Sequence, residues 1–173
     1  MTDPVVIVGG DAAGLSAASK LSREGPDREV IVFERGRWVS YAHCGEPYFV
    51  KGEVDTLDDL LSLSPAEIAE RGIDLRRGHE VVGVDTDART VAVEGADGSF
   101  EQPYGDLVVA TGARARTGPI PGSELTGAFT IHGLDSAAAV RALLTPPAAF
   151  AVDDLGGEGH VDRERVIRYG AME

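Results

Sequence analysis

One sequence pattern limits most strongly how this chain can fold. It is a buried strand, followed by glycines and then by a helical pattern. Pro4 to Val8 is typical of a short strand in a parallel sheet. Asp11 to Glu24 predicts a helix, which Gly25 and Pro26 stop. Glu29 to Phe33 predicts a second strand. A strand, glycine turn, helix and strand within about thirty residues form a βαβ unit, with parallel strands and a right-handed crossover.

The glycine turn of this unit, Gly9-Gly10-Asp11-Ala12-Ala13-Gly14, predicts a dinucleotide site. Gly9 would make the tight turn, the helix N-terminus would offer N–H groups to a pyrophosphate, and Gly14 would allow close helix-to-strand packing. Glu34 follows Gly14 by twenty residues, where a carboxylate accepts hydrogen bonds from ribose hydroxyls. Asp11 replaces the middle glycine, so its carboxylate must point away from the pyrophosphate. The spacing leaves FAD and NAD open, and the alternative is a glycine turn beside a surface glutamate.

The rest of the chain adds a small antiparallel sheet and several short elements. Ser64 to Glu67 has the pattern of a helix N-cap and predicts a helix to about Arg71. Three β runs separated by turns then predict a meander, over Glu80–Asp85, Thr90–Glu94 and Ser99–Glu101. The remaining predictions are a short helix over Cys44–Lys51, strands over Leu107–Ala110 and Phe129–Ile131, and a helix over Asp135–Leu144. The predicted fold class is α/β, with a parallel sheet and a small antiparallel meander.

Charge and hydropathy exclude several classes of partner. Sixteen basic and twenty-nine acidic residues give a net charge of −13, which disfavours nucleic acid and anionic membranes as partners. Any anionic ligand therefore needs a local cationic site. No apolar run approaches the roughly 18 residues that span a bilayer, and the N-terminus lacks the pattern of a signal peptide, so we expect a cytoplasmic location. The four histidines show no metal-ligand spacing, and we expect no metal site.

Three sequence blocks, in this order, resemble the N-terminal part of the pyridine nucleotide–disulfide oxidoreductases. They are VVIVGGDAAG at residues 5–14 with SAAS at 16–19, VIVFERG and SYAHCGEPYF at 30–36 and 40–49, and VVATGARAR at 108–116. The most similar branch has a single active-site Cys and includes coenzyme A disulfide reductases, persulfide reductases and NADH oxidases. The resemblance implies a Rossmann-like FAD-binding domain. It also implies NAD(P)H as co-substrate, bound in a separate domain. The cofactor contacts implied by position are Gly9, Ala13, Gly14, Glu34, Arg35, Val82, Thr111 and Gly112.

Cys44 is the only cysteine of the chain, which excludes a disulfide within these residues. It stands where a short helix is predicted to begin, and a helix N-terminus favours the thiolate, the species that attacks sulfur. By resemblance it is the catalytic Cys, lies next to the flavin, takes electrons from it and forms a mixed disulfide with coenzyme A, or a sulfenic or persulfide state. The alternative is an inert buried thiol.

The resemblance also implies a site for coenzyme A or another small disulfide or persulfide. The substrate contacts implied by position are Ser16, Arg23, Ser40, His43 and Arg71. The two arginines suit phosphate groups in an otherwise acidic chain, although each also suits the C-terminal end of a helix. His43 stands where relatives usually carry Asn, so it keeps a hydrogen-bonding group and adds a titratable one.

Several parts of the family pattern have no counterpart in these residues. No second glycine fingerprint follows Leu144, and neither a later FAD segment nor a dimerisation domain is recognisable. We therefore expect residues 1–147 to form an incomplete FAD-binding domain, and residues 148–173 to form a tail of unassigned role. Weak FAD binding, self-association or a complementing chain, and no NAD(P)H turnover by this chain alone are expected. The alternative is a non-catalytic domain that binds adenine nucleotides.

Overall fold

The computed structural model describes residues 3–125 and 127–144, which fall into two compact units. The first unit contains the described residues up to Tyr41 and those from Leu61 to Ala113. The second unit contains Ala42–Leu60 and the described residues from Arg114 onward. The predicted tail, residues 148–173, lies outside the described residues.

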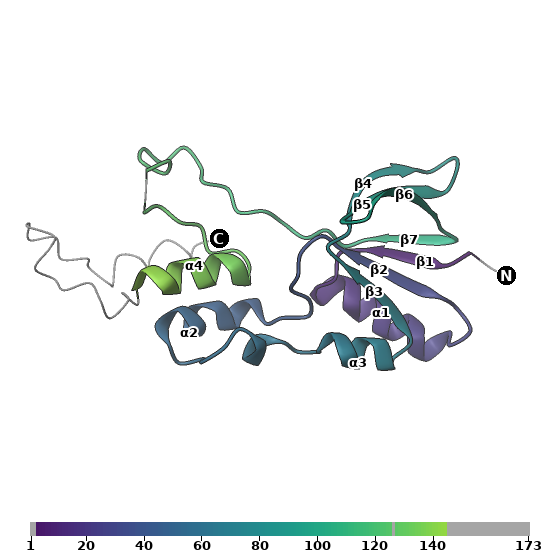
Figure 1. The fold of residues 1–173 in the computed structure, drawn as a ribbon, viewed down its shortest axis with the longest axis horizontal. Helices are drawn as coiled ribbons and strands as arrows, with labels where there is room; N and C mark the ends of the chain where they lie inside the picture. The colour runs from purple at the N-terminus through teal and green to yellow at the C-terminus, as the bar shows by residue number, and fades with distance from the viewer. Residues whose placement is uncertain (1–2, 126, 145–173) are drawn as a thin grey trace, which may run out of the picture. The chain divides into compact units, whose positions relative to one another are not determined.

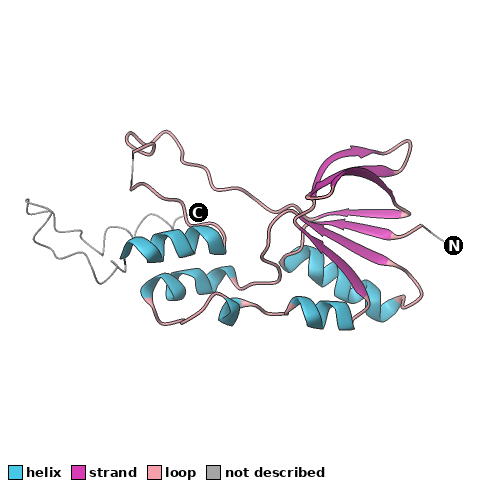
Figure 2. Ribbon diagram, in the orientation of Figure 1, coloured by secondary structure: helices cyan, strands magenta, loops and turns pink. Residues whose placement is uncertain are grey.

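A four-stranded parallel sheet forms the centre of the first unit (Figure 2). Its strands, in spatial order, are β3 (Ile73–Arg77), β2 (Val30–Glu34), β1 (Val5–Val8) and β7 (Asp106–Val109). All four residues of β1 are buried, which confirms the expectation from its continuous apolar run. The sequence pattern did not predict β3, because charged residues flank its two apolar positions. β3 forms by pairing with β2 in parallel.

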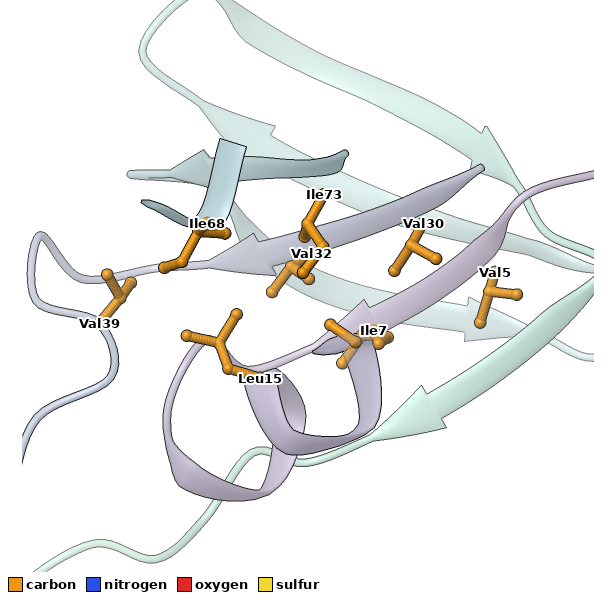
Figure 3. Close-up of a cluster of buried hydrophobic side chains, with 9 residues drawn as sticks. Val5, Ile7, Leu15, Val30, Val32, Val39, Ile68 and Ile73 are labelled. Carbon is orange, nitrogen blue, oxygen red and sulfur yellow. The ribbon is translucent and has the colours of Figure 1, made fainter. Parts of the chain in front are cut away.

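Two helices cover one face of this sheet (Figure 1). They are α1 (Ala12–Glu24) and α3 (Pro65–Glu70), which contribute Leu15 and Ile68 to a core under the strands. Figure 3 shows these side chains facing Val5, Ile7 and other residues of the same face. Burying a side chain of this size contributes about 1.5–3 kcal/mol, so this core holds the glycine turn against the ends of the strands.

The opposite face of the parallel sheet packs on the predicted meander. This sheet has the order β4-β5-β6, with bounds Glu80–Asp85, Thr90–Gly95 and Gly98–Pro103. Val91 and Val93 of β5 are fully buried and pack with Phe33 of β2. The α/β class with a parallel sheet and a small antiparallel sheet is confirmed.

The predicted capping box at the start of α3 is present. Glu67 N–H donates to Oγ of Ser64 at 3.3 Å, and Ser64 N–H donates to Oε2 of Glu67 at 2.8 Å. The hydrogen bond from the Ser64 N–H, followed by that from its hydroxyl, lowers the pKa of Glu67 below its usual 4.5. This helix leads into Arg71, its C-cap residue, so the box helps to position that side chain.

We expect Ser64→Ala to lower the free energy of unfolding by about 1 kcal/mol at pH 7, as loss of an N-cap does. Because the pKa of Glu67 is lowered in the folded state, its ionised carboxylate stabilises the fold above the usual pKa. That contribution is lost as the pH falls through the lowered value. Urea unfolding at pH 7 and pH 3 measures both effects. Equal stability of the variant and the unchanged chain at pH 7 would contradict this account.

The second unit contains helices and two 3₁₀ turns, His43–Gly45 and Asp58–Leu60. Its helices are α2 (Glu46–Lys51) and α4 (Leu134–Leu144). The guanidinium of Arg141 lies over the Phe49 ring at 4.3 Å and donates to the Val54 carbonyl at 2.8 Å. These contacts hold α4 against the segment that contains α2.

Two predictions for this unit need correction. The short α-helix begins at Glu46, because a 3₁₀ turn occupies residues 43–45. The predicted strand over residues 129–131 is wrong, since that segment has no regular structure in the described chain. Two apolar residues, Phe129 and Ile131, do not form a strand without a partner that satisfies the backbone groups of the segment. The helix expected from Asp135 to Leu144 is confirmed and begins one residue earlier. No helix of the described residues is long and apolar enough to cross a bilayer.

Candidate nucleotide and substrate sites

The glycine turn after β1 has the tight geometry that its sequence predicts. Gly9 has a φ of 111°, in the region that favours glycine, and its N–H donates to the Phe33 carbonyl at 2.8 Å. A Cβ at Gly9 would collide with the Ala110 carbonyl, and one at Gly14 would collide with the Gly9 carbonyl. These glycines therefore let α1, β1 and the residue after β7 approach one another closely. The approach lies at the carboxyl ends of the parallel strands, which is where α/β sheets bind ligands.

Glu34 joins the end of β2 to the glycine turn. One carboxylate oxygen accepts from the Gly10 N–H at 2.8 Å, and the other accepts from the Gly36 N–H at 2.7 Å. Because an ionised carboxylate has about four acceptor positions, two backbone donors leave capacity for ribose hydroxyls. The side chain is half-buried and oriented by the two backbone donors.

Asp11, the residue that raised concern for an anionic ligand, is turned toward the chain after β2. Its Oδ1 accepts from the Tyr41 N–H at 3.2 Å, and its side chain makes no capping hydrogen bond to α1. The first-turn N–H groups of α1, including that of Ala13, have no carbonyl four residues back within the helix. The helix N-terminus therefore presents donors and a positive dipole to a pyrophosphate, as the fit of a dinucleotide requires.

The other predicted cofactor residues lie in the same unit. Thr111 and Gly112 are exposed and directly follow Ala110, whose N–H donates to the Val8 carbonyl at 2.8 Å. Arg35 pairs with Glu80 at 3.8 Å, so its guanidinium is directed to the start of β4. Val82 on β4 is 53% exposed. Their contacts with a cofactor stay predictions.

An open groove of about 400 Å³ begins at the N-terminal turn of α1 and brings four of the five predicted substrate residues together. Ser16 and Arg23 lie on the same face of α1, seven residues apart, and the groove also contains Ser40 and Arg71. The other lining residues were not predicted from the sequence: Asp11, Ala12, Leu15, Ser19, Tyr41, Ser62 and Leu63. Ser19 could have been found from the helical spacing, because it lies between Ser16 and Arg23 on one face.

The two arginines of the groove give the acidic chain a local cationic site. The Arg71 guanidinium donates to Oγ of Ser19 at 3.2 Å, and the Arg71 carbonyl accepts from the Ser22 hydroxyl. Arg71 is therefore held against α1, the helix that also carries Arg23. Ser40, which lines the groove, is buried with a φ of 50°, an uncommon conformation for a residue with a side chain. Its backbone is held by the Gly10 carbonyl and the Ser62 N–H, which explains how that conformation persists.

Cys44 and His43 belong to the second unit and lie on the 3₁₀ turn before α2. Cys44 is exposed, so it is not a buried thiol, and its reactivity stays a prediction. Nδ1 of His43 lies 3.1 Å from Oε1 of Glu46, a carboxylate that the sequence analysis did not single out. Among residues 3–125 and 127–144, no three His, Cys, Asp or Glu side chains cluster in a way that could hold a metal ion.

The glycine turn, the anchored Glu34 and the parallel sheet define the first unit as a Rossmann-like dinucleotide-binding domain. The family model described as pyridine nucleotide-disulphide oxidoreductase matches residues 3–171, and the chain belongs to this family. Members of the family bind FAD and use NAD(P)H. The match continues beyond Leu144, where the final predicted helix ends.

Individual relatives agree with this assignment. The chain is 40% identical to an NAD(P)H coenzyme A polysulfide/persulfide reductase from Pyrococcus horikoshii, over 99% of this chain and 38% of the relative. It resembles the crystal structure of reduced Bacillus anthracis CoADR-RHD, with a TM-score of 0.77 and 29% identity over 83% of this chain and 27% of that one. For an NAD-dependent persulfide reductase from A. fulgidus, the TM-score is 0.75 and the identity 34%, over 79% of this chain and 27% of that one. These 173 residues thus span less than two fifths of the relatives they match.

Proposed function

We propose that this chain is the FAD-binding segment of an NAD(P)H-dependent oxidoreductase that reduces coenzyme A disulfide or persulfide. The observation that most directly supports this proposal is the groove. It contains Arg23 and Arg71 and begins at the glycine turn. Asp11 and Ala12 belong both to the groove and to that turn. A cofactor and a phosphate-bearing substrate would therefore both be held near the start of the same helix.

The residues of the first unit fit the adenosine half of FAD. The N–H groups at the start of α1 would bind the pyrophosphate, and Glu34 would accept from the ribose hydroxyls. We propose Gly9, Ala13, Gly14, Arg35, Val82, Thr111 and Gly112 as further contacts. When bound, the flavin supplies the electron transfer between nicotinamide and sulfur.

The charge of the groove favours a coenzyme A substrate over oxygen. Coenzyme A carries phosphate groups, which arginine binds through charge-assisted hydrogen bonds, whereas oxygen needs no cationic site. Since the whole chain carries −13, an anionic substrate gains its favourable field only where arginines gather. Ser16 and Ser40 of the groove would add hydroxyl groups for the polar parts of the substrate. His43, in the second unit, is proposed as the remaining substrate contact.

Cys44 is proposed as the redox-active sulfur. Its thiolate attacks one sulfur of the substrate, so that a new S–S bond forms and the other sulfur leaves as a thiolate. The exposure of Cys44 supports this role, because an attacking thiol must be accessible. A cytoplasmic location is part of the proposal, since that compartment keeps single thiols reduced. Self-association or completion of the nicotinamide site by another polypeptide also belongs to it.

Titration of the chain with FAD tests the class of function. Saturable but weak FAD binding, together with coenzyme A binding, is expected. Binding of ADP as tight as that of FAD, with no affinity for coenzyme A, would favour a non-catalytic adenine-nucleotide domain instead.

The groove arginines give a sharper prediction. Arg23→Gln and Arg71→Gln should each weaken coenzyme A binding by about tenfold to a hundredfold, the loss of one charge-assisted hydrogen bond of about 1.5–3 kcal/mol. Calorimetry at two salt concentrations measures this, because the ionic part of binding decreases with salt. Arg77→Gln, on β3 and outside the groove, is the matched control and should bind normally. FAD affinity should stay the same in all three variants. Unchanged coenzyme A affinity in both groove variants would contradict the substrate proposal.

A further inference from the structure

The carboxylate of Glu46 is buried and has hydrogen-bonding partners within the protein, unlike a solvated charge on the surface. Glu46 is 3% exposed and stands at the first position of α2. Its Oε1 contacts Nδ1 of His43 at 3.1 Å and accepts from the Gly133 N–H at 3.1 Å. Burying a carboxylate is costly unless hydrogen bonds compensate, so these two contacts hold the carboxylate in a defined position.

The donor from Gly133 is itself positioned by the turn before α4. Gly133 has a φ of 102°, which favours glycine. The Ser136 hydroxyl accepts from the His132 N–H at 2.9 Å and donates to the Gly133 carbonyl at 2.7 Å. The His132 ring stacks on the His43 ring, with centroids 5.8 Å apart. Glu46 and this turn thus hold the His43 imidazole from two sides.

This arrangement assigns the two nitrogens of His43 different tasks. A backbone N–H can only donate, so Oε1 of Glu46 acts as an acceptor toward Gly133, and we assign the Nδ1–H of His43 as a second donor to it. A proton that the ring exchanges with a substrate then passes through Nε2, as in other carboxylate–imidazole pairs. The His43 side chain is 45% exposed, which makes the ring accessible to substrate.

We propose that His43 is a catalytic proton carrier for Cys44 and that Glu46 is its positioning residue; this inference rests on the proposed function of Cys44. His43 and Cys44 are neighbours on one 3₁₀ turn. The Cys44 thiolate attacks a disulfide R–S–S–R, an S–S bond to Cys44 forms, and the electron pair of the old S–S bond goes to the leaving sulfur. Nε2 of His43 delivers to that sulfur the proton that Cys44 lost. Cys44–SH and R–S–S–R thereby become Cys44–S–S–R and R–SH, with Cys44 oxidised and the leaving half reduced.

A contrast between two leaving groups tests this role. A small dialkyl disulfide, bis(2-hydroxyethyl) disulfide, releases a basic thiolate that gains from protonation. The aryl disulfide 5,5′-dithiobis(2-nitrobenzoate) releases a weakly basic thiolate that leaves without a proton. Single-turnover rate constants of the reduced full chain with each reagent give an alkyl-to-aryl ratio. Cys44→Ser provides the blank. Neither reagent needs the FAD or coenzyme A sites, so a failure of those sites does not affect this result.

We expect His43→Asn to lower the alkyl-to-aryl ratio by about a hundredfold, the lower end of the range for general acid catalysis. Glu46→Gln should lower the ratio in the same direction, because an amide cannot hold the ring as a carboxylate does. His79→Gln, a histidine of the first unit, is the matched control and should leave the ratio unchanged. His43 is partly exposed, so its variant tests the proposal even if the buried Glu46 variant does not fold.

An unchanged ratio in His43→Asn would overturn the inference while leaving Cys44 as the reactive sulfur. An equal loss with both reagents would also overturn it, since that outcome indicates a disturbed turn rather than a lost proton donor. No reaction of Cys44 with either reagent would overturn both this inference and the proposed role of Cys44. If the disulfide reactions behave as expected but coenzyme A or FAD does not bind, the result would contradict the proposed function and not this inference.

Discussion

Gly14→Ala is expected to destabilise the protein by about 3 kcal/mol and to abolish measurable FAD binding. A Cβ at this position would collide with the Gly9 carbonyl oxygen and lie 3.3 Å from Cγ2 of Ile7. The colliding atom belongs to the backbone of the glycine turn, so relief requires α1 to move away from β1. Overpacking of this kind costs about 1–3 kcal/mol, with the upper end expected where a backbone atom must shift.

Urea unfolding midpoints and FAD titration measure this effect. Gly25→Ala is the matched control, because the nearest atom to a Cβ there, the Leu21 carbonyl oxygen, is 3.6 Å away and the φ of Gly25 is −139°. The control should differ little from the unchanged chain in both measurements. Equal midpoints for the two variants would show that close packing at Gly14 is not what holds the turn.

Glu34→Ala should weaken binding of FAD and of ADP by about 10- to 100-fold for each ribose hydrogen bond that is lost. A hydrogen bond to a charged group contributes about 1.5–3 kcal/mol, and each 1.4 kcal/mol changes affinity tenfold. The substitution also removes the acceptors of the Gly10 and Gly36 N–H groups. Glu34→Gln keeps the shape and one acceptor oxygen, so its loss of affinity should be smaller.

Calorimetry with ADP separates this contact from any effect on the flavin half. Glu101→Ala, an exposed carboxylate on β6, is the control and should bind as the unchanged chain does. Urea unfolding of each variant shows whether lost affinity reflects lost structure. If Glu34→Ala binds ADP with unchanged affinity, the predicted role of this carboxylate is wrong.

The groove and the glycine turn both include residues at the start of α1. Leu15 of α1 belongs to the buried core and also lines the groove, beside the exposed Ser16. One helix thus carries core contacts, a predicted pyrophosphate site and predicted substrate contacts. Substitutions that displace α1, such as Gly14→Ala, should therefore weaken cofactor and substrate binding together. Arg23→Gln, at the exposed end of the helix, should affect the substrate alone.

Local physical chemistry determined much of this protein from its sequence alone. The continuous valine and isoleucine runs of β1 and β2, the turn at Gly9 and the Ser64–Glu67 capping box depend on neighbours a few residues away, so their patterns are readable in one dimension. The position of Glu34, twenty residues after Gly14, follows from the length of a βαβ unit. These features sufficed to predict β1, β2 and the glycine turn that follows β1.

Tertiary structure alone decided features that depend on partners distant in the sequence. β3 exists because β2 offers it backbone groups, whereas residues 129–131 stay irregular without such a partner. The orientation of Asp11 depends on the Tyr41 N–H, thirty residues away. Arg71 meets Ser19, and Glu46 meets Gly133, across 52 and 87 residues. No local pattern specifies which distant donor a side chain will find, because that choice is made only when the elements pack.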